Sequence, residues 1–202
     1  MIQDIVLATG NAGKVREIQN ILCDCNVNIL PQSQFDVPEA VEDGLTFVEN
    51  ALIKARHASK LTGLPAIADD SGIEVDYING QPGIHSSRYA GESGNNKANN
   101  AKLLDVLSGV ERAKRTARFQ CVIVFLKHEF DPTPLICQGT WEGIITETEE
   151  GHEGFGYDPL FFVESEQCTS AQLDPALKNR ISHRGKALKV LVSYFNDKRV
   201  TE

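Results

Sequence analysis

The most constraining feature of this chain is its opening unit, in which a short strand leads through a glycine-containing loop into an amphipathic helix. We interpret Ile2–Ala8 as a short buried strand that ends at the turn residues Thr9-Gly10-Asn11. From Lys14 to about Asp24 the apolar residues return at helical spacing, and Val27–Leu30 then forms a second expected strand. A strand, loop, helix and strand in this order favour an α/β fold.

The rest of the chain extends this unit into a mixed sheet with flanking helices. A helix is expected from Thr46, because Thr46 and Glu49 have the spacing of a capping box, and Gly63 should end it. The further expected elements are strands at 66–68 and 73–78 separated by a turn at 69–72, a helix at 98–107, strands at 117–127 and 135–146 joined by a hairpin at 131–134, a glycine-rich loop at 151–159, a helix capped by Asp174, and a final helix at 182–197. The irregular order predicts a mixed-sheet α/β protein rather than a regular alternation of strands and helices.

Charge narrows the class of partner. The 202 residues include 28 acidic and 20 basic side chains, a formal net charge of −8. An acidic surface repels phosphate polymers and anionic lipid, so we expect no nucleic-acid polymer and no membrane as partner. A local group of bases can still oppose the global charge and hold a free nucleotide.

Targeting features and cysteines point to the cytoplasm. No apolar run approaches the ~20 residues that span a bilayer, and the first ten residues lack the basic segment of a signal peptide. The five cysteines form no Cys-x-x-Cys pair, and the spacing of Cys23 and Cys25 is not that of a zinc site. Reduced thiols in a cytoplasmic protein are the expected state.

Four short segments carry residues suited to a nucleotide site, and the first is Thr9–Lys14. A loop between strand and helix offers backbone N–H groups at a positive helix end, and Lys14 can neutralise phosphate. It is not a Walker A loop, because Ala8 replaces the first glycine and Val15 replaces the magnesium-binding Ser or Thr. An ordinary tight turn explains the same residues equally well.

The second segment is Asp69-Asp70-Ser71-Gly72, which we pair with Glu42. Adjacent residues of an extended strand point to opposite faces, so both aspartates bind one ion only if the backbone turns there. A magnesium site usually needs one or two carboxylates, with water and substrate phosphates completing the shell. For the motif alone, a solvated turn in which Asp69 accepts hydrogen bonds from backbone amides is the favoured alternative.

The third segment is Gly154–Pro159. Its two aromatic residues lie among glycines, so that a ring can stack on a flat ligand while the backbone approaches closely. Asp158 can accept a hydrogen bond from a ligand or cap the turn at Pro159. A purely structural aromatic corner explains the composition as well.

The fourth segment is Ser182-His183-Arg184-Gly185, which Lys178 precedes. Ser182 is expected to cap the last helix, which places two bases at its positive first turn. That position is unfavourable for cations unless an anionic or electron-rich ligand offsets the cost. A solvated pair of surface bases is the alternative.

Taken together, these residues resemble the inosine triphosphate pyrophosphatase family, the dITP/XTP pyrophosphatases. The likeness runs from Ile5 almost to Phe195, and its motifs appear in the order of the family: Thr-Gly-Asn-Ala-Gly-Lys, Glu-Asp-Gly-Leu-Thr-Phe-Val-Glu-Asn-Ala, Ala-Asp-Asp-Ser-Gly, Phe-Gly-Tyr-Asp-Pro and Ser-His-Arg-Gly. The resemblance implies one domain over residues 1–202, with an elongated mixed sheet, two lobes and an active-site cleft between them. It also implies Mg²⁺ dependence, a homodimer, and hydrolysis of deaminated purine nucleoside triphosphates (ITP, dITP and XTP) to the monophosphate and pyrophosphate.

The same resemblance implies roles for individual residues. Asp70 corresponds to the general base and a magnesium ligand, and Glu42 corresponds to a further metal carboxylate. The implied substrate contacts are Thr9, Gly10, Asn11, Ala12, Gly13, Lys14, Lys54, Ser71, Phe155, Gly156, Tyr157, Asp158, Lys178, His183 and Arg184. We expect the bases among them, with Mg²⁺, to make the pocket locally positive. A pyrophosphatase for modified pyrimidine nucleotides and a non-catalytic nucleotide sensor remain alternatives.

Overall fold

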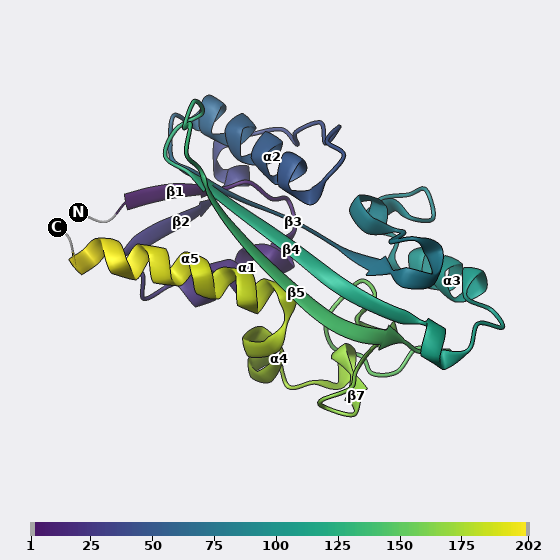
Figure 1. Cartoon of the computed structure of the whole chain (residues 1–202). Coiled ribbons are helices and arrows are strands. Elements are labelled where there is room, and N and C mark those ends of the chain that lie inside the picture. The colour runs from purple at the N-terminus through teal and green to yellow at the C-terminus, as the bar shows by residue number, and fades with distance from the viewer. Residues whose placement is uncertain (1–2, 201–202) are drawn as a thin grey trace. The chain divides into compact units, whose positions relative to one another are not determined.

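The computed structural model describes residues 3–200, with the backbone alone at residue 12 and at 198–200. Its strands are β1 Gln3–Leu7, β2 Val27–Pro31, β3 Ala66–Val75, β4 Thr116–Leu126, β5 Leu135–Ile145, β6 Phe161–Val163 and β7 Cys168–Thr169, and its α-helices are α1 Ala12–Leu22, α2 Phe47–Thr62, α3 Asn96–Val106, α4 Pro175–Ile181 and α5 His183–Val200 (Figure 1). The strands hydrogen-bond in the order β2-β1-β3-β4-β5-β6-β7. The expected α/β fold with a mixed sheet is confirmed.

The chain divides into two compact units that are interleaved in sequence. The first comprises Met1–Asp70, Cys121–Gln138 and Lys186–Glu202, and the second comprises Ser71–Gln120 and Gly139–Gly185. Strand β3 therefore passes from the first unit into the second between Asp70 and Ser71.

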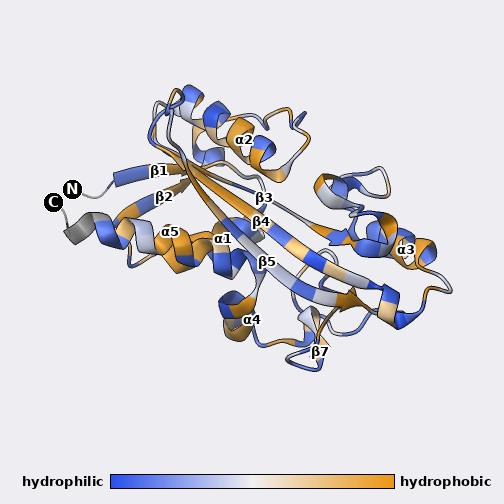
Figure 2. Ribbon diagram, in the orientation of Figure 1, coloured by the Kyte–Doolittle hydropathy of each residue, from blue (hydrophilic) through white to orange (hydrophobic). Residues whose placement is uncertain are grey.

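In the first unit, the parallel strands β1, β2 and β3 are covered by helices on both faces. Strand β1 pairs in parallel with β2 and with β3. The side chains of β1 alternate between two cores: Ile5 and Leu7 pack with α1 and α5, whereas Val6, and Ala8 just after the strand, pack with α2. Figure 2 shows the apolar residues gathered along α5 and along the strands in this part of the chain.

Helix α2 packs on the sheet largely through small side chains. Ala51, Ala55 and Ala58 are fully buried, and they belong to one cluster with Ala66 and Ala68 of β3, against which Phe47, Val48 and Leu52 also pack. A contact between alanines lets a helix axis approach the strands more closely than leucine or isoleucine would. From the same helix, Lys54 reaches Asp70 of β3.

The second unit has an antiparallel sheet and an aromatic core. Strand β5 pairs with β6, and β6 pairs with β7, both in antiparallel fashion. The Phe161 ring lies 4.6 Å from that of Phe119 and 5.2 Å from that of Trp141, measured between centroids. Leu103 of α3 and Tyr157 complete this core.

The capping residues act where the sequence places them. Thr46 accepts a hydrogen bond from the Glu49 N–H, and Gly63 ends α2 with a φ of 70°. Asp174 caps α4, with Pro175 as its first residue, and Ser182 Oγ accepts from the Gly185 N–H at the start of α5. Apart from the region around residues 66–78, the predicted helices and strands lie within a few residues of the observed ones. Ile2, the predicted first residue of the first strand, lies outside the described residues.

The predicted turn at Asp69-Asp70-Ser71-Gly72 is wrong. Strand β3 continues through it from Ala66 to Val75, and the predicted strand end at 76–78 is a short 3₁₀ helix. The sequence suggested a solvated turn because Asp, Ser and Gly favour turns and Gly72 permits one. In the structure, Asp69 is 1% exposed and Asp70 is 8% exposed. Burial is tolerated here because each carboxylate pairs with a lysine.

The predicted hairpin between β4 and β5 is held by the carboxylate of Asp131, which is 3% exposed. Its two oxygens accept hydrogen bonds from the backbone N–H groups of Lys127, at 3.0 Å, and Thr133, at 2.9 Å. Both hydrogen bonds favour the charged carboxylate, so they lower the pKa of Asp131 below its ordinary value of 3.8. The bond from the Lys127 N–H has the larger effect, and the bond from the Thr133 N–H comes next.

We predict that Asp131→Ala lowers the free energy of unfolding at pH 7 by roughly 1–3 kcal/mol, since two backbone donors lose their acceptor. A lowered carboxyl pKa stabilises the fold above the ordinary pKa, and this contribution is lost as the pH falls through the folded value. The difference between wild type and variant should therefore shrink below about pH 3.8. Urea unfolding at several pH values measures this difference in the free energy of unfolding. The control is Glu111→Ala, which breaks an exposed ion pair.

Candidate active site

Strand β3 directs its two neighbouring aspartates to opposite faces of the sheet. Asp69 Oδ2 lies 2.9 Å from Lys14 Nζ, and Asp70 Oδ1 lies 2.8 Å from Lys54 Nζ. Lys14 comes from α1 and Lys54 comes from α2, which cover the two faces. A continuous strand forces this arrangement, because adjacent side chains alternate. The two aspartates therefore do not converge on one ion.

Lys54 joins Asp70 to a second carboxylate, that of Glu42. Its Nζ lies 3.2 Å from Glu42 Oε2, and the Lys54 and Asp70 side chains are only 14% and 11% exposed. Burial alone would lower the pKa of Lys54, but the charges of Asp70, Asp69 and Glu42 outweigh burial and raise it above 10.5. Burial raises the pKa of Asp70, and Lys54 offsets only part of that effect.

Asp70 and Glu42 suit a magnesium ion that also binds phosphate. Among residues 3–200 no group of three or more His, Cys, Asp or Glu side chains is arranged to hold a metal ion. Magnesium needs only one or two protein carboxylates when water and phosphate supply the other ligands, and here one ammonium contacts both carboxylates. The donor set fits a metal that binds together with its substrate, not a cage made by protein alone.

The residues paired around β3 do not by themselves carry an excess of positive charge. Lys14 and Lys54 face the three carboxylates of Asp69, Asp70 and Glu42, so these five residues carry one net negative charge. The expected positive pocket also includes Lys178, His183, Arg184 and a magnesium ion, and it stays a prediction. A polyanion needs a further cation to be favourable beside this group.

The Thr9–Lys14 loop uses much of its own hydrogen-bonding capacity. Asn11 Oδ1 accepts from the N–H groups of Gly13, at 2.9 Å, and Lys14, at 3.1 Å, while the Asn11 N–H donates to Thr9 Oγ1. These are donors that the sequence offered to phosphate. Gly10 is exposed, and a Cβ at this position would meet a Glu39 carboxylate oxygen at 2.8 Å. Lys14 remains the main charged group of the loop.

In the second unit, Asp158 organises the Gly154–Pro159 loop from within. It is 3% exposed, and its Oδ2 accepts from the Phe155 N–H at 2.8 Å and from Lys178 Nζ at 2.6 Å. Its Oδ1 accepts from Ser170 Oγ at 2.7 Å. Of the two roles open to Asp158 from the sequence, this geometry matches the turn cap, because internal donors already engage both oxygens.

The two aromatic residues of this loop differ in exposure. Tyr157 is buried, its hydroxyl donates to the Ser86 carbonyl at 2.8 Å, and burial raises its pKa. Phe155 is 44% exposed, and the cationic groups of Arg184 and Lys178 lie 5.7 and 5.9 Å from its ring centroid. Phe155 is therefore the ring available for stacking, and Tyr157 forms the structural corner. Between them, Gly156 has a φ of 62°.

His183 and Arg184 are buried, so the alternative of a solvated surface pair is wrong. Their exposures are 6% and 4%. The His183 ring stacks on Phe119 at 4.7 Å between centroids, with 14° between the planes. Arg184 Nη2 donates to Ser71 Oγ at 3.1 Å. Aromatic packing and the hydroxyl of β3 thus hold both bases at the first turn of α5.

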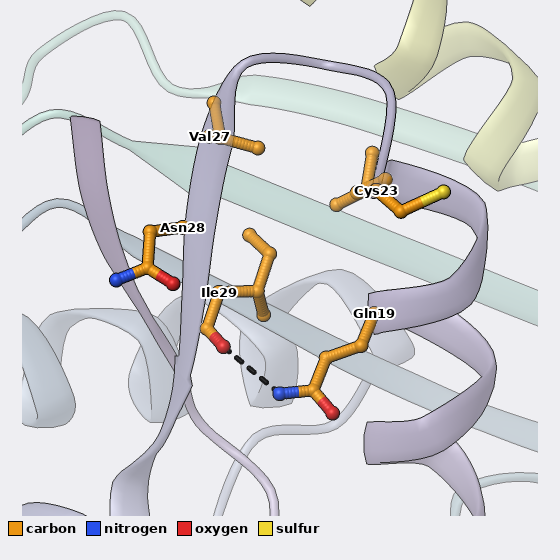
Figure 3. Close-up of a pocket in the computed structure, with 6 residues that line it drawn as sticks. Gln19, Cys23, Val27, Asn28 and Ile29 are labelled. Carbon is orange, nitrogen blue, oxygen red and sulfur yellow. Dashed lines mark hydrogen bonds between the residues drawn. The ribbon is translucent and has the colours of Figure 1, made fainter. Parts of the chain in front are cut away.

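A separate hollow in the first unit does not suit a triphosphate. It has a volume of about 210 Å³ and lies between α1 and β2, where Gln19 Nε2 donates to the Ile29 carbonyl (Figure 3). No charged side chain lines it; the lining residues are Gln19, Leu22, Cys23, Val27, Asn28 and Ile29. None of them is among the residues that the sequence assigns to the site.

Sequence reasoning missed several residues that fix these groups. Asp69 as the partner of Lys14 follows from strand alternation once β3 is known to be continuous. Ser86 and Ser170 hold Tyr157 and Asp158 from distant parts of the chain, and no local pattern predicts such contacts.

A comparison of the sequence with known families gives a match to the Ham1 family over residues 5–194. The chain belongs to the Ham1 family. A protein of Vibrio parahaemolyticus described as dITP/XTP pyrophosphatase is 58% identical over 96% of this chain and 98% of its own length. One of the same description from Thioalkalivibrio sulfidiphilus is 59% identical over 93% and 96%.

Solved structures place this Ham1 chain in the same fold. The HAM1 protein of Coxiella burnetii superposes with a TM-score of 0.92 at 49% identity, covering 98% of this chain and 100% of its own. A Mycobacterium abscessus protein described as nucleoside-triphosphatase / dITP/XTP pyrophosphatase gives a TM-score of 0.77 at 36% identity, covering 93% and 97%. The resemblance drawn from the motifs is therefore confirmed at the level of family and fold.

We predict that Gly185→Ala unfolds or strongly destabilises the second unit. A Cβ at this position would lie 1.8 Å from the Asn179 carbonyl oxygen, and a backbone atom cannot swing away as a side chain can. The free energy of unfolding should fall by about 3 kcal/mol or more. Thermal denaturation measures it, and Lys189→Ala, at an exposed position of the same helix, is the control. A melting temperature equal to that of the control would contradict the close contact.

Proposed function

We propose that this protein hydrolyses deaminated purine nucleoside triphosphates, ITP, dITP and XTP, to the monophosphate and pyrophosphate, and so removes them from the nucleotide pool before they enter DNA or RNA. The observation that carries the proposal is Lys54 held between Asp70 and Glu42, with Lys14 on the other face of the same strand. Membership of the Ham1 family and the relatives described as dITP/XTP pyrophosphatases support it.

Three lysines are proposed to contact the phosphates. Lys14, Lys54 and Lys178 each pair with a carboxylate at 2.9, 2.8 and 2.6 Å, so each ammonium is oriented before a nucleotide binds. A magnesium ion held by Asp70 and Glu42 supplies Lewis-acid neutralisation of phosphate charge. Thr9, Gly10, Asn11, Ala12 and Gly13 are proposed to line the phosphate chain beside Lys14.

Asp70 is proposed to act on the attacking water. The carboxylate accepts a hydrogen bond from that water, or its proton, while the oxygen attacks the α-phosphorus. The bond between the α-phosphorus and the bridging oxygen breaks, and pyrophosphate leaves with the electron pair. Burial, which raises the pKa of Asp70, makes the carboxylate a better proton acceptor than an exposed aspartate.

The base is proposed to contact residues of the second unit. Phe155 offers its exposed ring for stacking, and Ser71, Gly156, Tyr157 and Asp158 shape the surrounding contacts. Hypoxanthine and xanthine present a carbonyl acceptor at the six-position, where adenine presents an amino donor. Donors from His183 or Arg184 would pair with the carbonyl and oppose adenine. Hydrogen-bonded sites of this kind can discriminate by ~10⁴ or more.

The remaining parts of the proposal concern the whole protein. We propose that residues 1–202 act as one functional domain, that the enzyme is magnesium-dependent and homodimeric, and that it works in the cytoplasm. The family resemblance supports these points. No helix among the described residues is long and apolar enough to cross a membrane.

A substrate panel tests the function directly. Pyrophosphate release is measured with Mg²⁺ and ITP, XTP, dITP, ATP, GTP or dTTP. We expect turnover of the first three and little of the others. Fast turnover of dTTP would favour the pyrimidine enzyme, tight ITP binding without turnover would favour a sensor, and equal turnover of ATP and ITP would defeat the specificity model.

We predict that Asp70→Asn lowers turnover of ITP at least about 100-fold, because the amide cannot accept a proton and is a weaker metal ligand. Nucleotide binding, measured by calorimetry with ITP, should persist because the lysines remain. Asp76→Asn, which alters an exposed ion pair with Arg118 in the second unit, is the matched control and should keep near-normal turnover. Near-normal turnover of Asp70→Asn would remove Asp70 from the mechanism.

We predict that Phe155→Ala raises KM for ITP roughly tenfold with a smaller change in kcat, because one base–aromatic stack contributes about 1–3 kcal/mol. Steady-state pyrophosphate release measures both constants. Phe130→Ala removes another exposed ring, 78% accessible, from the hairpin of the first unit and should leave KM unchanged. An unchanged KM in Phe155→Ala would exclude stacking on this ring.

A further inference from the structure

The position of Lys54 has a consequence for how a divalent cation reaches this site. One ammonium contacts Asp70 Oδ1 at 2.8 Å and Glu42 Oε2 at 3.2 Å, and these are the two carboxylates that suit the cation. Magnesium binds carboxylate oxygen at about 2.0–2.1 Å. A cation at that distance from the same oxygens meets the positive charge of Lys54 directly, so the two compete for one place.

Local structure keeps the three groups together. Asn50 Oδ1 accepts from the Gly44 N–H at 2.9 Å, and Glu49 Oε2 accepts from the Leu45 N–H at 2.8 Å, so the start of α2 fastens the loop that carries Glu42. Lys54 lies one turn after Asn50 on the same helix. The Glu42–Lys54 contact is therefore built within one loop–helix segment and does not depend on a chance surface encounter.

Charge shows what the removal of Lys54 would do. With both lysines, the group of Lys14, Lys54, Asp69, Asp70 and Glu42 carries one net negative charge. Without the charge of Lys54 it carries two, which a divalent cation neutralises. A buried or half-buried group with uncompensated charge is costly, so such a site binds a cation more strongly.

We propose that Lys54 competes with the metal ion for Asp70 and Glu42, so that the protein without nucleotide binds divalent cations weakly. A bound triphosphate draws Lys54 away and makes the two carboxylates available. The phosphate chain gives Lys54 another acceptor, which frees Asp70 and Glu42 for the cation. This last step rests on the proposed function, because it takes a triphosphate as the acceptor. Metal and nucleotide then bind cooperatively, each raising the affinity of the other by the same factor.

The test measures Mn²⁺ binding to the nucleotide-free full-length protein by electron paramagnetic resonance and calorimetry. Lys54→Met removes the charge and keeps the length of the side chain, and we expect it to bind Mn²⁺ at least tenfold more tightly than wild type, about 1.4 kcal/mol. Lys54→Arg keeps the charge and should bind as wild type does. Because no nucleotide is present, the result does not depend on which triphosphate is the substrate.

Matched variants separate this role from a general effect of lost charge. Lys178→Met removes the ammonium from a comparable pair, with Asp158 in the second unit. It should give no gain, because among the described residues Asp158 is the one carboxylate that forms an ion pair with this ammonium. Adding Glu42→Gln to Lys54→Met should abolish the gain. Circular dichroism and melting curves verify folding, and Lys54→Gln replaces Lys54→Met if that variant is unstable.

Three results would overturn the proposal: tight Mn²⁺ binding by wild type without nucleotide, no tighter binding in the charge-removing variant, or a gain that survives Glu42→Gln. A failure of the substrate panel with a normal Mn²⁺ series would instead reject the proposed substrate and leave the competition intact. In a second titration, inorganic triphosphate is added to wild type and to Lys54→Met. The factor by which triphosphate raises the Mn²⁺ affinity should be at least tenfold larger in wild type than in Lys54→Met.

Discussion

The alternation of side chains along β3 is the constraint on which the first unit's polar group depends. A strand that continues through Asp69 and Asp70 must send one carboxylate to each face, and each face is covered by a helix. A buried carboxylate without a partner would be very costly, so the helix on each face must supply a cation within ion-pair distance of it. Lys14 of α1 and Lys54 of α2 meet this requirement. The lysines that are candidates for the site therefore also compensate the burial of Asp69 and Asp70 in β3.

The second unit compensates its buried polar groups with one ammonium, neutral donors and aromatic rings. Asp158 is satisfied by a hydroxyl, a backbone amide and an ammonium, and His183 lies against the ring of Phe119. These contacts join residues far apart in the chain, including Ser170 and Phe119. They hold one exposed ring, that of Phe155, beside two cations. Rigid support around the exposed ring of Phe155 suits recognition of a planar ligand.

Most helices, strands and helix caps could be predicted from the sequence, because they depend on residues that are close together in the chain. Thr46, Gly63 and Ser182 act where spacing places them. The turn at 69–72 failed because burial of the aspartates depends on lysines contributed by two helices, which no window around the motif contains. The same limit applies to the pairing of Asp69 with Lys14, which no local pattern predicted. The order of the motifs was enough to predict the family, whereas the pairing of these charges was not predicted.

Family membership and local geometry support different parts of the interpretation. The Ham1 match covers nearly the whole chain and explains why the motifs occur in one order. It does not describe how this chain balances its charges, which follows only from the contacts of Lys14, Lys54 and Lys178. Each of these lysines is held by a carboxylate, so the proposed phosphate binding would exchange one anionic partner for another. Affinity then depends on the difference between two salt bridges, which is smaller than either.

The alanine face of α2 extends the functional region beyond the charged residues. Ala51, Ala55 and Ala58 are buried with Ala66 and Ala68 of β3, and Lys54 reaches Asp70 from the same helix. Larger side chains at these alanines would overpack the core and push α2 away from β3. The contact between Lys54 and Asp70 can therefore be lost through a substitution that changes neither charged residue.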